Sequence, residues 1–252
     1  AGSRPSLLSR TVTVLIASGF SGSDFAHGRP AWLGATHQAI AETIMRAGYG
    51  TLFVSDSQLG AHGIGQIEID PPLGLVVAHS GSGLETPGKL LRALHIGNVP
   101  VVTTADHYEW PGCDTVISDH DQGSYDLTRW LIDRGARRLL RCRPKLDRLP
   151  LWLVRRDAGL VRALAEAGLP VLPPLEVPKL EEVITEPDAF EQMSRLLAGY
   201  LAQPLKGPDR VDAILTLSDG FISEVARACR HVGADPRKDV LLAGYDHYWT
   251  EC

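Results

Sequence analysis

The stretch Ala213–Tyr245, AILTLSDGFISEVARACRHVGADPRKDVLLAGY, decides the fold class of this chain. Its apolar start, Ala213–Leu217, predicts a buried strand, and so does its apolar end, Val240–Tyr245. Between them, Gly220–Val232 has apolar residues at helical spacing, and Gly233 follows as a suitable helix C-cap. Buried strands that alternate with an amphipathic helix predict a parallel α/β sheet.

The same alternation of strands and helices extends over the rest of the chain. Further strands are predicted at Thr11–Ser18, Thr51–Ser55, Leu73–Ala78, Val99–Thr104, Asp114–Ser118, Arg138–Cys142 and Val171–Pro173. Further helices are predicted at Ala31–Ala47, Pro87–His95, Asp121–Arg134, Leu151–Ala167 and Ala189–Ala202. About nine or ten strands are too many for one open sheet, so we expect two sheets.

One segment departs from the alternation. Asp56–Pro72 contains three glycines and has weak helical periodicity, although a crossover helix should connect two parallel strands there. Either this helix is short and irregular, or residues are absent from the chain.

The composition is that of a soluble globular protein, with 44% hydrophobic and 22% charged residues. The net charge of −5 argues against a free-standing nucleic-acid-binding domain. No apolar run reaches the length of about 18 residues that a membrane span needs, and the polar N-terminus lacks a signal-peptide core. The four cysteines, Cys113, Cys142, Cys229 and Cys252, are widely spaced, which favours reduced thiols and a cytoplasmic location.

Motifs of common enzymes and cofactor sites are absent from the sequence. It has no G-x-S-x-G, H-E-x-x-H or P-loop, and its histidines are not paired at metal-ligand spacing. His79–Gly83, HSGSG, follows a predicted strand; it can bind a phosphate through backbone N–H groups or form an ordinary turn. We therefore expect no metal and no cofactor.

A strongly basic stretch runs from Arg134 to Arg162, with ten Arg or Lys residues against two Asp. It is either a solvated surface at a lobe boundary or an electropositive cleft wall that binds an anionic ligand.

Four segments in this order resemble the effector-binding domain of LacI/GalR-family bacterial transcription regulators. Asp119–Gly135 is similar to the family's aspartate followed by a glycine-closed helix, and Arg156–Leu169 is similar to its R-x-x-G helix. Ala213–Gly220 corresponds to a strand that ends in Asn-Asp in the family, and Val232–Asp246 resembles the motif G-x-x-P-x-D-V-x-V-x-G-[FY]-D.

This resemblance implies two Rossmann-like lobes with parallel sheets and a ligand cleft between them, a type I periplasmic binding protein-like fold. The N-terminal lobe is then 11–134 and the C-terminal lobe 135–246, with 247–252 beginning a return crossover. Because the family has a further strand and helix after this point and a helix-turn-helix before it, we expect the polypeptide to extend beyond both ends.

The resemblance also implies a ligand site. Its candidates are Trp32, Asp119, Arg156, Ser218, Asp219 and Asp246. Arg156 supplies a rigid fork of donors for ligand hydroxyls, the aspartates accept hydrogen bonds, and Trp32 offers a face for stacking. Trp110 and Trp249 are further stacking candidates. Alternatively, an Asp–Arg pair is structural, and Trp32 is a core residue.

Three residues depart from the family pattern. Ser218 stands where the family has Asn, Ala39 where it has Gly, and His247 where a second acid follows.

The expected function is ligand sensing. A small molecule, a sugar or sugar derivative, binds between the lobes of a homodimer and controls DNA binding by the helix-turn-helix, with no membrane partner. The alternatives are a sugar-binding protein of a transport system, which shares the two-lobe fold, and an enzyme on a Rossmann-like scaffold, which the missing catalytic motifs disfavour.

Overall fold

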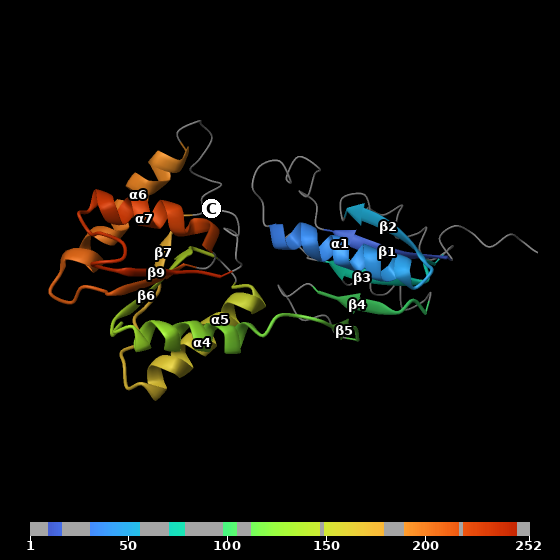
Figure 1. Ribbon diagram of the computed structural model, residues 1–252, viewed down its shortest axis with the longest axis horizontal. Helices are drawn as coiled ribbons and strands as arrows, with labels where there is room; N and C mark the ends of the chain where they lie inside the picture. The colour runs from blue at the N-terminus through green and yellow to red at the C-terminus, as the bar shows by residue number, and fades with distance from the viewer. Residues whose placement is uncertain are drawn as a thin grey trace, which may run out of the picture. The chain divides into compact units, whose positions relative to one another are not determined.

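The chain divides into two compact units that meet in sequence between Ser118 and Asp119. The structure is a computed structural model (Figure 1). It describes residues 10–16, 31–55, 71–78, 98–104, 112–146, 149–178, 189–216 and 219–245. Each unit has its own parallel sheet, which confirms the two α/β lobes expected from the sequence.

The first unit is built on a five-stranded sheet of order β2-β1-β3-β4-β5. Its strands are β1 (Thr11–Ile16), β2 (Gly50–Ser55), β3 (Gly74–Ala78), β4 (Val101–Thr103) and β5 (Asp114–Thr115). Helix α1 (Ala31–Arg46) precedes β2, and Gly48 adopts a φ of +85° after it, a conformation that suits glycine at the end of a helix. Val14, Leu75 and Val77 are at most 1% exposed, because the central strands are covered on both faces.

The second unit is built on a four-stranded sheet of order β7-β6-β8-β9. Its strands are β6 (Leu139–Pro144), β7 (Leu175–Val177), β8 (Ala213–Thr216) and β9 (Leu241–Ala243). Its helices are α4 (His120–Asp133), α5 (Leu151–Glu166), α6 (Ala189–Lys206) and α7 (Ile222–His231), with a short 3-10 turn, η4 (Asp219–Phe221), before α7.

Helices cover both faces of this second sheet, α4 and α5 on one face and α6 and α7 on the other (Figure 1). Successive residues of a strand point to opposite faces. Accordingly, Leu139 packs in the core with α4 and α5, whereas Leu140 and Cys142 pack in the core with α6 and α7. On this alternation, Arg141 and Arg143 lie on the α4/α5 side of β6.

Two predicted element bounds are wrong. The strand predicted at Val171–Pro173 begins later, at Leu175, because Pro173 and Pro174 lack the N–H groups that a ladder needs. The helix predicted to end at Ala202 continues to Lys206 through Pro204, and its last turn buries Leu205 in the core.

The predicted lobe boundary after Arg134 lies one helix later than the division between the two units. The difference is α4, which packs along α5 and so belongs to the second unit. The predicted helix Pro87–His95, the HSGSG turn at His79–Gly83 and residues 56–70 of the irregular segment lie outside the described residues. None of the described helices is both long and apolar enough to cross a membrane.

The two helices α4 and α5 approach each other closely at Gly159. A methyl group built on Gly159 would overlap the backbone carbonyl oxygen of Asp121 and lie 3.0 Å from the backbone nitrogen of Tyr125. Only a residue without a side chain allows this contact. Gly159 therefore sets the spacing of the helix pair.

We predict that Gly159→Ala lowers the free energy of unfolding by about 1–3 kcal/mol, because the added methyl forces the backbones of α4 and α5 apart. Gly199→Ala in α6 is the matched control, since nothing lies within 4 Å of its built methyl. That variant should gain about 0.5–1 kcal/mol from the better helix propensity of alanine. Urea unfolding midpoints measure both changes, and equal effects of the two variants would contradict the close approach.

Candidate functional site

A pocket opens in the second unit near the carboxyl ends of β6 and β8, beneath α4 and α5. It is partly open to solvent. The residues that line it are Ser124, Arg141, Cys142, Arg143, Leu153, Arg156, Asp157, Leu160, Leu215, Thr216 and Tyr245. The carboxyl edge of an open parallel sheet is where such folds bind ligands.

Arg156 is held in this pocket by two aromatic rings and a histidine. Its guanidinium carbon lies 4.7 Å from the centroid of the Trp152 ring and 4.2 Å from that of Tyr245. Its Nε donates a hydrogen bond to Nδ1 of His120 at 3.3 Å, which requires that this nitrogen carries no proton. Although it is charged, Arg156 is only 8% exposed, and the stacked rings and the hydrogen bond fix its fork of donors.

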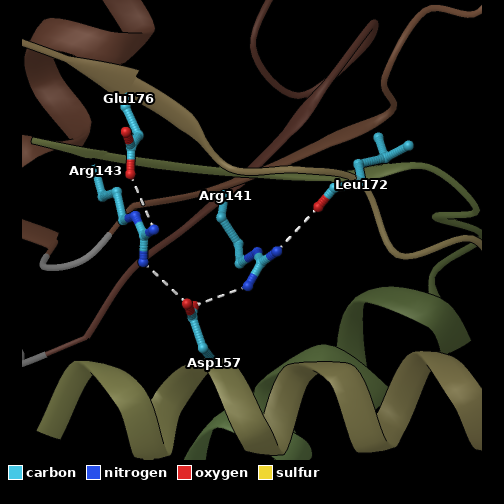
Figure 2. A network of polar contacts seen from close by, with 5 residues as sticks. All are labelled: Arg141, Arg143, Asp157, Leu172 and Glu176. Atoms are coloured by element: carbon cyan, nitrogen blue, oxygen red, sulfur yellow. Dashed lines mark hydrogen bonds and ion pairs between the residues drawn. The ribbon is translucent and has the colours of Figure 1, made fainter. Parts of the chain in front are cut away.

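Asp157, the next residue of α5, lies between two arginines of β6 (Figure 2). Its Oδ1 is 3.1 Å from an Nη of Arg141, and its Oδ2 accepts a hydrogen bond from an Nη of Arg143 at 3.0 Å. Arg143 also donates to Glu176 of β7 at 3.0 Å, and Arg141 donates to the carbonyl oxygen of Leu172 at 2.9 Å. This polar network continues the surface of the pocket toward β7.

The chain after β9 is pressed against the chain after β8. The N–H of Asp219 donates to the carbonyl oxygen of Tyr245 at 2.7 Å. A methyl built on Gly244 would lie 2.7 Å from the backbone of Asp219 and from Oγ1 of Thr216, so this position admits only glycine. The contact fixes Tyr245, and with it the ring on which Arg156 stacks.

Solved structures of several regulators resemble this chain along most of its length. A LacI-family transcriptional regulator from Enterococcus faecium with bound ribose is 16% identical, with a TM-score of 0.63 over 93% of this chain and 77% of that one. The transcription regulator CcpA of Lactococcus lactis is 20% identical, with a TM-score of 0.61 over 94% and 78%. The complex of the transcriptional regulator CelR with cellobiose is 20% identical, with a TM-score of 0.68 over 96% and 69%.

The chain has the LacI-family fold. No protein-family model matches the sequence, and no curated protein sequence matches it either.

Of the six residues predicted for the ligand site, the structure places one, Arg156, in the described pocket. Asp219 is half-buried in η4 beside Gly244. Asp119 is exposed and caps α4, where its side chain accepts the N–H of Gln122 at 3.0 Å. The ligand roles of all six remain predictions.

The other predicted residues cannot be placed by their side chains. Trp32 belongs to α1 of the first unit, and its side chain lies outside the described part of the structure. Ser218, Asp246 and the stacking candidates Trp110 and Trp249 also lie outside it.

Ten of the eleven residues that line the pocket were not predicted from the sequence, among them Arg141, Arg143, Asp157 and Tyr245. For Arg141 and Arg143 the sequence does contain a signal, because they stand two positions apart, in and directly after a predicted strand, and therefore point to the same face of the sheet. Of the two interpretations of the basic stretch, a solvated surface does not describe these arginines, whose side chains are 14% and 10% exposed.

Cys142 lines the pocket and also packs in the core with Cys229 of α7. Burial raises the pKa of the Cys142 thiol to about 12, with a further contribution from Cys229, and burial raises the pKa of Cys229 to about 11. Among the described residues, no three His, Cys, Asp or Glu side chains gather to hold a metal ion.

We predict that Cys142 and Cys229 resist thiol reagents while the chain is folded. At pH 8 a thiol with a pKa near 12 is ionised in only about one molecule in ten thousand, and only the thiolate reacts. The half-buried Cys113 is the internal comparison. Alkylation followed by peptide mass spectrometry should show Cys113 labelled first and the other two labelled after denaturation; prompt native labelling of Cys142 would refute the burial.

Proposed function

We propose that this chain is the ligand-sensing domain of a LacI/GalR-type transcriptional regulator. Its ligand is a small polar molecule, a sugar or sugar derivative, which binds at the carboxyl edge of the second unit's sheet. In this proposal the ligand lies between the two units and controls DNA binding by a helix-turn-helix, in a homodimer of a cytoplasmic protein.

The arrangement of Arg156 is the observation that carries this proposal. A buried guanidinium stacked on two rings is costly to desolvate, and its rigid donors suit ligand hydroxyls or an anionic group. Two of the regulators with this fold were solved with ribose and with cellobiose. Support for a sugar as the ligand comes from those proteins.

The residues of the pocket also fit ligand binding better than they fit catalysis. The described pocket has one carboxylate, that of Asp157, and arginines hold both of its oxygens, so neither oxygen is free to act on a substrate. The structures with the same fold reported above are regulators.

A thermal-shift screen tests the proposal directly. The chain is heated with ribose, cellobiose, other neutral sugars, sugar phosphates, sugar acids and nucleobases, each at millimolar concentration. A ligand at 100 times its Kd adds about 2.7 kcal/mol, which raises the Tm of a chain of this size by several degrees. A concentration-dependent shift supports the proposal, whereas no shift from any of these classes contradicts it.

We predict that Arg156→Lys weakens binding of the ligand found in this screen by about 30-fold or more. Lysine keeps the charge but loses the planar fork and the stacking on Trp152 and Tyr245. Arg162→Lys in the same helix is the matched control, because its side chain is 45% exposed and pairs with Asp121 outside the pocket. Isothermal titration calorimetry measures both affinities. Equal affinity of the two variants for the ligand would contradict the assignment of Arg156 to the binding site.

A further inference from the structure

Two arginines occupy positions in β6 where a parallel sheet normally has apolar side chains. Strand β6 is an interior strand, paired with β7 on one side and β8 on the other. Leu139, Arg141 and Arg143 alternate along one face of it, toward α4 and α5. Strands of a sheet covered on both faces are usually continuous apolar runs, so this face changes from core to charge at its carboxyl end.

Burial of these two guanidinium groups is only partly offset by carboxylates. Asp157 is shared between them, and the side chain of Glu176, the second partner of Arg143, is 38% exposed. The Nε of Arg143 is buried and has no hydrogen-bond partner among the described residues. An ion pair that served stability alone is replaceable by apolar side chains of similar volume, often without loss.

The lining of the pocket therefore has an excess of positive charge. It contains the three guanidinium groups of Arg141, Arg143 and Arg156, and one carboxylate, that of Asp157. A neutral ligand that displaces water from this pocket leaves the excess charge desolvated and uncompensated. A ligand with a negative group compensates it, and planar guanidinium forks match the oxygens of carboxylates and phosphates.

We propose that the pocket selects an anionic ligand, a sugar acid or a sugar phosphate, and that Arg141 and Arg143 receive its carboxylate or phosphate group. This inference rests on the proposed function, since it names the ligand class of the same pocket. Arg156 then contacts the polyol part, and Asp157 of α5 orients the two arginines. Glu176 competes with the ligand for Arg143.

Matched probes test the charge of the ligand. Glucose, glucose 6-phosphate, glucuronate and inorganic phosphate are compared by thermal shift, with sodium chloride added to equal ionic strength. We expect inorganic phosphate or at least one charged sugar to raise the Tm, and glucose to have no effect. A larger Tm shift with inorganic phosphate than with glucuronate indicates that the site binds a phosphate group, and the reverse indicates a carboxylate.

Substitutions test whether the arginines of β6 bind the anion. Arg143→Gln and Arg141→Gln should each weaken binding of the effective anion at least tenfold, whereas Arg162→Gln should leave it unchanged. Glu176→Gln removes the competing carboxylate from a partly exposed position and should strengthen anion binding several-fold. A merely structural network predicts the opposite for this variant, namely lower stability with no gain in affinity.

Each outcome separates this inference from the proposed function. A shift with glucose, ribose or cellobiose equal to that with the charged probes overturns the anionic ligand and leaves the sensor intact. Anion binding that is unchanged in both Arg143→Gln and Glu176→Gln overturns the assignment to β6. No response to any of the charged probes overturns the inference, and the wider screen then decides the proposed function.

Discussion

The contact between α4 and α5 at Gly159 is the constraint on which the second unit depends. Because no side chain separates the helices there, the backbone of α5 lies against Asp121 and Tyr125 of α4. Arg156 and Asp157 come just before this contact in the same helix. The spacing of the helix pair therefore fixes how far these two side chains stand from the sheet and from His120 at the start of α4.

The second sheet supplies the other half of the pocket through its carboxyl edge. The inward face of β6 is apolar at Leu139, where the core needs packing, and charged at Arg141 and Arg143, where the strand reaches the pocket. The chains after β8 and β9 meet at Gly244, which brings Tyr245 over Arg156. Two rigid layers thus hold the polar groups, and rigid elements position a site more accurately than loops do.

Much of the fold could be predicted because its signals are local. Apolar runs such as Ala213–Leu217 and helix-ending glycines such as Gly233 located most elements to within a few residues. One exception arose where tertiary packing overrode a local signal, because the buried Leu205 extends α6 past Pro204. Likewise, α4 belongs to the second unit through its packing on α5, which no local pattern reveals.

The site was less predictable than the fold, because it depends on contacts between elements distant in sequence. Arg156 was found through its R-x-x-G motif, but the basic stretch around it did not show which arginines are buried. To tell the buried arginines from the exposed ones, one must know which side chains of β6 point to one face and that α5 covers this face. Tyr245 was missed for the same reason, since its role is set by an arginine 89 positions earlier in the chain.

The preorganised state of Arg156 has a consequence for sensing. A ligand shifts an equilibrium between two arrangements only by the difference in its affinity for them. Contacts made wholly within the second unit stay the same in every arrangement of the two units, so they contribute affinity without contributing a signal. The pocket in the second unit thus accounts, in the proposed function, for recognition of the ligand. In the proposed function, the signal must come from a group of the first unit, and Trp32 of α1 is the residue that the sequence offers for it.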